Sequence, residues 1–179
     1  MARTSFLLVA CLALSSAPRL VSQQTYDPEA RLGALGITLP PVGRPLANYV
    51  PAVRSGNLVF LAGHGPAQPW DATATGKVDT DLTVEQGYQA ARNVGINLLA
   101  SLKAEVGDLR KVRRIVKVLG MVNSAPGFAQ QPEVINGFSD LIVQVFGDAR
   151  GKHARSAVGM AALPRNLSVE IEMVVEIEP

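Results

Sequence analysis

Cysteine and histidine are scarce in this sequence of 179 residues, and each shortage excludes a class of site. Cys11 is the single cysteine, so an intrachain disulfide and a zinc site built on thiolates are both excluded. The two histidines, His64 and His153, have no neighbouring ligands at the spacing of a metal-binding helix or a structural zinc site. We therefore expect neither a metal ion nor a cofactor.

Phosphate-binding loops and serine nucleophiles in a recognisable setting are missing as well. Gly63 and Gly65 are followed by Pro66 and further loop residues rather than by a helix, so nucleotide binding is not supported. Ser156 lacks the Gly-x-Ser-x-Gly surroundings in which hydrolases present a serine nucleophile. Nucleophilic catalysis by serine is therefore not expected.

The first 24 residues have the character of a targeting segment. Arg3 gives a basic start, Phe6–Leu14 is an apolar run too short to span a bilayer, and small or polar residues follow. We expect export to the periplasm or out of the cell. Two alternatives stay open: a mitochondrial presequence, since no acidic residue precedes Asp27 and Arg19 adds a second positive charge, and a lipoprotein anchored through Cys11.

Residues 25–179 have the length of one ordinary domain and no apolar run of transmembrane length. Two of the 17 basic residues, Arg3 and Arg19, precede this part, so its remaining basic residues are as numerous as its 15 acidic ones. A protein that binds nucleic acid usually carries an excess of basic residues on one face. We therefore expect no nucleic-acid partner.

Hydrophobic periodicity predicts five strands and two helices in the order ββ, α, β, α, ββ. The expected strands are Tyr49–Val53, Leu58–Ala62, Val112–Val122, Arg155–Leu163 and Leu167–Ile177, the last two joined by a tight connection at Pro164-Arg165-Asn166. The first helix follows a capping box of Thr83 and Gln86 and runs to Gly107, and the second runs from about Pro132 to Gly147.

Two further segments have a less regular pattern. The stretch from Gln23 to Leu46 is rich in proline and glycine, which favours an ordered lead-in rather than a helix, or else a short strand. The segment from Pro66 to Gly76 has the composition of a loop, in which the single tryptophan, Trp70, is expected either to rim a pocket or to anchor the packing.

The last expected strand alternates regularly. Its apolar residues Val169, Ile171, Met173, Val175 and Ile177 share one face, whereas most residues of the other face are glutamates. One face of the sheet is therefore expected to form the core with both helices. This pattern predicts an α+β fold in which two helices pack on one face of a mixed sheet.

Seven short motifs stand out along the chain: His153–Gly159 (HARSAVG), Leu163–Asn166 (LPRN), Val169–Glu172 (VEIE), Tyr49–Val53, Gly56–Leu58, Ala62–His64 and Val134–Gly137. They resemble the motifs of the Rid/YjgF (L-PSP endoribonuclease-like) family. Together they span most of residues 25–179. The resemblance implies a chorismate-mutase-like fold, assembled as a homotrimer with small-molecule sites between subunits.

Deaminases of this family hydrolyse enamines and imines such as 2-aminoacrylate, which implies roles for particular residues here. Arg155 corresponds to the arginine that binds the substrate carboxylate, and Glu170 to the acidic residue that holds or activates water. The resemblance also places four residues around the substrate, namely Tyr49, Gly63, His64 and Asn136.

Three positions depart from the common family pattern. Ala157 stands where many deaminases have cysteine, Ala62 where serine is common, and His64 where many relatives have glutamine. The first two remove polar atoms from the expected site. A non-catalytic trimeric ligand-binding or chaperone-like protein is therefore the alternative to a deaminase, and ribonuclease activity is less expected because the charges balance.

Overall fold

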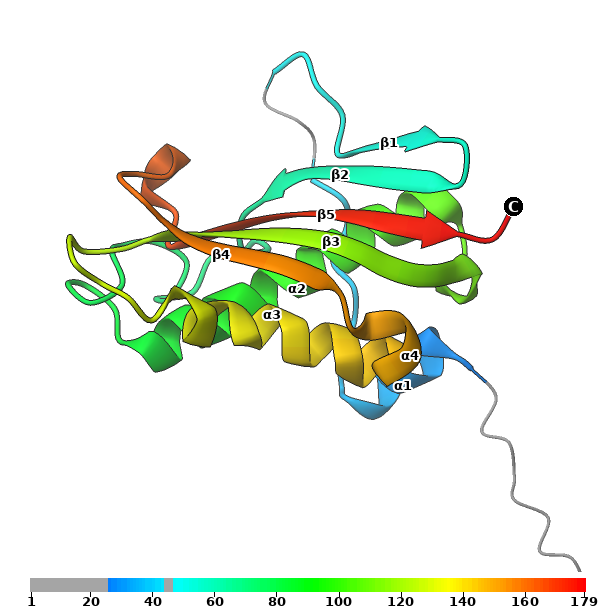
Figure 1. The fold of residues 1–179 in the computed structure, drawn as a ribbon, viewed down its shortest axis with the longest axis horizontal. Helices are drawn as coiled ribbons and strands as arrows, with labels where there is room; N and C mark the ends of the chain where they lie inside the picture. The colour runs from blue at the N-terminus through cyan, green and yellow to red at the C-terminus, as the bar shows by residue number, and fades with distance from the viewer. Residues whose placement is uncertain (1–25, 44–46) are drawn as a thin grey trace, which may run out of the picture.

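A mixed five-stranded sheet forms one layer and helices form the other in the computed structural model, which describes residues 26–43 and 47–179 (Figure 1). The strands are β1 Ala52–Ser55, β2 Leu58–His64, β3 Val112–Asn123, β4 Ala154–Met160 and β5 Val169–Ile177. The helices are α1 Pro28–Ala34, α2 Val84–Val106, α3 Gln131–Phe146 and α4 Asp148–Gly151, with short 3₁₀ turns at Leu109–Lys111 and Pro164–Asn166. The long helices α2 and α3 lie side by side on one face of the sheet, as expected (Figure 1).

The two long helices begin and end where the sequence signals indicated. The Thr83 side chain accepts a hydrogen bond from the Gln86 backbone, and the Gln86 side chain accepts one from the Thr83 backbone, which completes the capping box. Gly107 ends α2 with φ 79°, and Gly147 ends α3 with φ 73°. Both angles lie in the left-handed region, which glycine adopts without a steric penalty.

The sheet order is β1-β2-β5-β3-β4. The expected hairpin is present as β1 and β2, which pair antiparallel. The last two strands are joined by the expected short connection, yet β3 lies between them, and β4 pairs with β3 in parallel. This crossover places β4 at an edge of the sheet, where only β3 pairs with it.

The core lies between the sheet and the two long helices. The alternation predicted for the last strand is confirmed, because the five apolar residues of one face of β5 are at most 2% exposed. Gly137 of α3 lies so close to α2 that an added Cβ would be 2.0 Å from the Tyr88 carbonyl oxygen. The two helices therefore approach each other to backbone contact at this point.

The expectation of a lead-in without a helix was wrong, because Pro28–Ala34 forms helix α1. The Asp27 side chain caps it by accepting a hydrogen bond from the Ala30 backbone, and Pro28 stands in the first turn, where its missing N–H costs nothing. Leu32 is buried in the core, so tertiary packing supports a helix too short to show a period.

The expected targeting segment, residues 1–24 with Cys11, lies outside the described residues. Within residues 26–43 and 47–179, no helix has both the length and the apolar character needed to cross a membrane.

Candidate functional site

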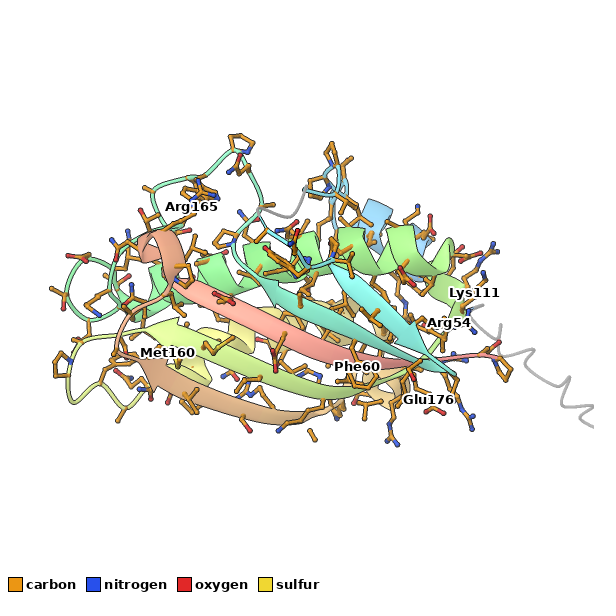
Figure 2. The ribbon with its side chains drawn as sticks, turned by 90° about the horizontal axis from the view of Figure 1, so that it is seen from above. Arg54, Phe60, Lys111, Met160, Arg165 and Glu176 are labelled. Atoms are coloured by element: carbon orange, nitrogen blue, oxygen red, sulfur yellow. The ribbon has the colours of Figure 1, made fainter. Side chains whose placement is uncertain are left out.

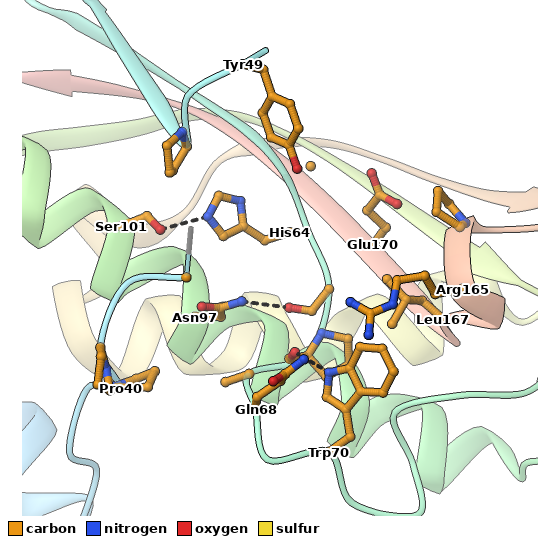
Figure 3. Close-up of a pocket in the computed structure, with 18 residues that line it drawn as sticks. Pro40, Tyr49, His64, Gln68, Trp70, Asn97, Ser101, Arg165, Leu167 and Glu170 are labelled. Carbon is orange, nitrogen blue, oxygen red and sulfur yellow. Dashed lines mark hydrogen bonds between the residues drawn. The ribbon is translucent and has the colours of Figure 1, made fainter. Parts of the chain in front are cut away.

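A cavity of about 490 Å³ opens between the end of β2, the start of β5 and the middle of α2 (Figure 3). Tyr49, Gly63, His64 and Glu170 all line it, so four residues proposed from the sequence come together. Trp70, for which a place at the rim of a pocket and a role in packing were both open, lies on the cavity wall. Several prolines complete the lining, so the cavity has a mixed apolar and polar wall, as a site for a small polar molecule needs.

Glu170 supplies the carboxyl group of this cavity. It lies on β5 and is half-buried, and its side chain passes directly over Gly63 of β2. A Cβ at position 63 would be 2.1 Å from Glu170 Oε1, so a side chain there would push the carboxyl group out of this position. Burial and the nearby charge of Glu172 raise the pKa of Glu170 above its ordinary value. This carboxyl group therefore holds a proton more readily than a free glutamate.

His64 is held in one tautomer on the opposite wall. Its Nδ1 lies 2.7 Å from the Ala62 carbonyl oxygen, which can only accept, so Nδ1 donates. Its Nε2 lies 2.7 Å from Ser101 Oγ and therefore accepts a hydrogen bond from the serine hydroxyl group (Figure 3). Burial lowers the pKa of His64, which favours the neutral ring. The histidine thus presents an immobilised, uncharged imidazole to the cavity.

Sequence reasoning did not select Ser101, which is 3% exposed and lines the cavity from α2. The only available signal was a polar residue within a run of buried apolar positions in that helix. A buried hydroxyl needs a hydrogen-bond partner, and His64 provides it.

Arg155 and Asn136 come together, but away from the cavity. Arg155 lies on β4, where Nη1 donates to Asn136 Oδ1 at 2.9 Å and to Ser139 Oγ at 3.0 Å, both on α3. Its Nη2 donates to the Pro132 carbonyl oxygen at 3.4 Å. The cavity adjoins β2 and β5, and β3 separates β5 from β4. Within one chain, the proposed residues therefore form two separate groups.

A chain of hydrogen bonds fixes the guanidinium of Arg155. The Ser139 hydroxyl accepts from Arg155 and lies 3.1 Å from His153 Nε2, to which it donates. His153 Nδ1 in turn donates to the Gly151 carbonyl oxygen at 2.6 Å. Burial chiefly, and the positive charge of Arg155 to a lesser extent, lower the pKa of His153. Ser139 was not anticipated from the sequence, because a single serine on a helix has no distinctive pattern.

The two half-buried histidines predict how stability depends on pH. Because the folded-state pKa of His64 and of His153 lies below the ordinary 6.5, the unfolded chain binds more protons as the pH falls through that value. The stability that the two neutral imidazoles contribute to the folded protein is therefore complete above pH 6.5. It is lost as the pH falls from 6.5 toward the lower folded-state pKa values.

We expect the free energy of unfolding, measured by urea denaturation, to fall across this window, and to fall less steeply in the His64→Gln, His153→Gln double variant. If the free energy of unfolding changed with pH equally steeply in the wild type and the double variant, the two histidines would not be its cause. Circular dichroism at the starting pH serves as the control that both proteins are folded.

Comparison with known proteins finds the same fold in one family. The model of the YjgF/chorismate mutase-like family, whose description includes a proposed endoribonuclease activity, matches residues 29–177. Protein TCP17 from Trypanosoma cruzi is 43% identical over 148 residues, which cover 83% of this chain and 92% of that protein. The 2-iminobutanoate/2-iminopropanoate deaminase of Dermatophagoides farinae is 30% identical over 142 residues, covering 79% and 95% of the two chains. The crystal structure of protein Atu1372 from Agrobacterium tumefaciens superimposes with a TM-score of 0.77 at 47% identity, over 84% of this chain and 92% of that one.

Proposed function

This chain belongs to the YjgF/chorismate mutase-like family, and on that premise we propose that it hydrolyses 2-imino acids to 2-oxo acids and ammonia. The observation that carries the proposal is the half-buried Glu170 carboxyl group, which lines the cavity over Gly63 with a raised pKa. A carboxyl group whose pKa is raised above its ordinary value takes and returns a proton more readily than a free glutamate. The deaminase from Dermatophagoides farinae supports the reaction class.

The reaction needs one water molecule and transfers both of its protons to the nitrogen. Water adds to the imine carbon, and Glu170 takes the proton that the water loses. Glu170 then returns this proton to the nitrogen, which gives a carbinolamine. Glu170 next takes the hydroxyl proton of the carbinolamine and passes it to the nitrogen as the carbon–nitrogen bond breaks, so that the carbonyl forms and both hydrogens of the water leave on ammonia. No oxidant, metal ion or further reactant enters this balance. The neutral imidazole of His64, held by Ser101, contributes a polar wall without adding a charge.

We further propose that Arg155 of one subunit binds the substrate carboxylate in the cavity of its neighbour. Arg155 is half-buried on the edge strand β4, and its guanidinium is held in place by three acceptors. A planar guanidinium so fixed suits bidentate binding of a carboxylate. In a closed homotrimer, the surface with Arg155 of each subunit would face the cavity with Glu170 of the next subunit, so that three complete sites form.

The face of the sheet opposite the helices supports such an assembly. Figure 2 looks toward this face, on which Phe60 lies 45% exposed in the middle of the sheet. Val158 and Met160 of the edge strand β4 are also more than a third exposed. Exposed apolar side chains gathered on one sheet face are typical of an interface between subunits.

The direct test is the release of ammonia from iminopropionate generated in situ by an amino-acid oxidase. We expect wild-type protein to exceed the uncatalysed rate, and Arg155→Ala to lower kcat/KM by about 10²-fold, since a charge-assisted bidentate pair is lost. Arg113→Gln, which removes an exposed arginine far from both groups, is the matched control. A wild-type rate equal to the uncatalysed rate would refute the proposal.

A non-catalytic binding protein is the second candidate. Ala62 and Ala157 lack the polar atoms that many deaminases of the family carry at these positions, which favours binding without turnover. Saturable binding of 2-oxo acids without any release of ammonia would support this candidate. Ribonuclease activity has no comparable support, since basic and acidic residues balance.

A further inference from the structure

Arg165 is a second arginine close to the proposed reaction, and it lines the cavity itself. It stands in the short turn between β4 and β5, with φ 57° in the left-handed region. Its guanidinium carbon lies 4.3 Å from the centre of the Trp70 ring. Trp70 is fixed in turn, because its Nε1 donates to the Pro66 carbonyl oxygen at 3.2 Å (Figure 3). The aromatic ring therefore supports the guanidinium at the cavity wall.

The hydrogen-bond donors of Arg165 are not engaged within the part of the chain that the structure describes. Three other arginines there have acidic partners: Arg110 pairs with Asp108, Arg113 with Glu176 and Arg150 with Glu178. Arg165 has neither an ion pair nor a hydrogen bond among the described residues. A guanidinium has five N–H donors in a planar fork, and stacking on an aromatic ring leaves all of them available. Arg165 is therefore preorganised to bind an anion.

Resting on the function proposed above, we infer that Arg165 binds a second carboxylate of the ligand, so that the preferred ligands are 2-imino and 2-oxo acids with two carboxylates. Arg155 of the neighbouring subunit takes the carboxylate next to the imine carbon, and Arg165 takes the one at the far end. A dianionic phosphate is disfavoured there, because Glu170 lines the same cavity and would repel it more strongly.

The size of the cavity agrees with this ligand class. About 490 Å³ lies within the range of pockets for larger ligands, and a three-carbon imino acid would leave most of that volume to water. A five-carbon diacid extends further from the reacting carbon and reaches toward the Trp70 wall. The second charge-assisted contact then fixes the orientation of the ligand.

The test compares two ligands that differ only in the second carboxylate. The affinities of the wild-type protein for 2-oxoglutarate and 2-oxopentanoate are measured by isothermal titration calorimetry at constant ionic strength. We expect 2-oxoglutarate to bind about tenfold to a hundredfold more tightly, which corresponds to one hydrogen-bonded charge pair. Quenching of Trp70 fluorescence by 2-oxoglutarate should follow the same binding curve, because Trp70 is the single tryptophan.

Arg165→Gln is expected to abolish this preference, so that both acids bind with similar affinity. Arg113→Gln serves as the matched control and should retain it. Equal binding of the two acids by the wild type would overturn the inference while leaving the proposed function intact. Binding of neither acid would overturn the inference, whereas ammonia release from iminopropionate decides the proposed function separately. A preference that survives in Arg165→Gln would overturn the role of Arg165.

Discussion

Changing Glu170 to glutamine is expected to lower kcat for imine hydrolysis by about 10²- to 10⁴-fold, the range typical of a lost general acid or base. Glutamine has nearly the same shape, so it can occupy the space over Gly63, but it cannot accept a proton from water. Ammonia release under saturating substrate measures the effect. Glu105→Gln is the matched control, because Glu105 is an exposed glutamate of α2 that does not line the cavity.

The same variant should be more stable than the wild type at neutral pH. The pKa of Glu170 in the folded protein lies above the ordinary value of 4.5. As the pH rises from 4.5 through the folded-state pKa, the carboxyl group ionises more readily in the unfolded chain, which destabilises the folded protein. Glutamine does not ionise, so we expect the variant to have a higher Tm than the wild type at pH 7 and the same Tm below pH 4.5. A variant that retains activity, or one that is less stable at pH 7, would contradict the role given to this carboxyl group.

Gly137→Ala is expected to destabilise the fold by about 3 kcal/mol, at the upper end of what overpacking a core usually costs. The added Cβ would be 2.0 Å from the Tyr88 carbonyl oxygen and 2.8 Å from its carbon. Both are backbone atoms of α2, which cannot move aside as the tip of a side chain can. Helices α2 and α3 would have to separate, and buried contacts along their length would be lost.

Gly33→Ala in α1 is expected to stabilise the fold, in contrast to Gly137→Ala. A Cβ at Gly33 meets no atom within 4 Å, so alanine should stabilise this helix by about 0.5–1 kcal/mol through its higher helix propensity. Urea denaturation of both variants gives the free energies of unfolding. If Gly137→Ala lay within about 0.5 kcal/mol of the wild type, the close approach of the two helices would be refuted.

The sequence predicts those elements whose signals are local. The capping box at Thr83 and Gln86 and the glycines that end α2 and α3 act through neighbouring backbone groups. The alternation of β5 is also readable, because one face of a strand is buried along its whole length. The two-layer α+β fold follows from these elements, since both long helices and the sheet must cover the same apolar residues.

Features that depend on distant parts of the chain could not be read in this way. Helix α1 is stabilised by burial of Leu32 rather than by a periodic pattern, and the order of β4 and β5 depends on the crossover around β3. In the site, motifs pointed to Arg155 and Glu170 individually, but only the topology shows that β3 keeps them apart in one chain. The partners Ser101 and Ser139 become apparent only when the two histidines are placed in space.

The central claim is that each site combines Arg155 of one subunit with Glu170 of its neighbour to hydrolyse imino acids. The most direct measurement mixes the two inactive variants, Arg155→Ala and Glu170→Gln, by joint refolding in equal amounts, and follows ammonia release from iminopropionate. If sites are shared between subunits, random assembly restores about one quarter of them, and activity should return to about one quarter of the wild-type level. A mixture as inactive as either variant alone, with exchange of subunits shown by mass spectrometry, would contradict the shared site.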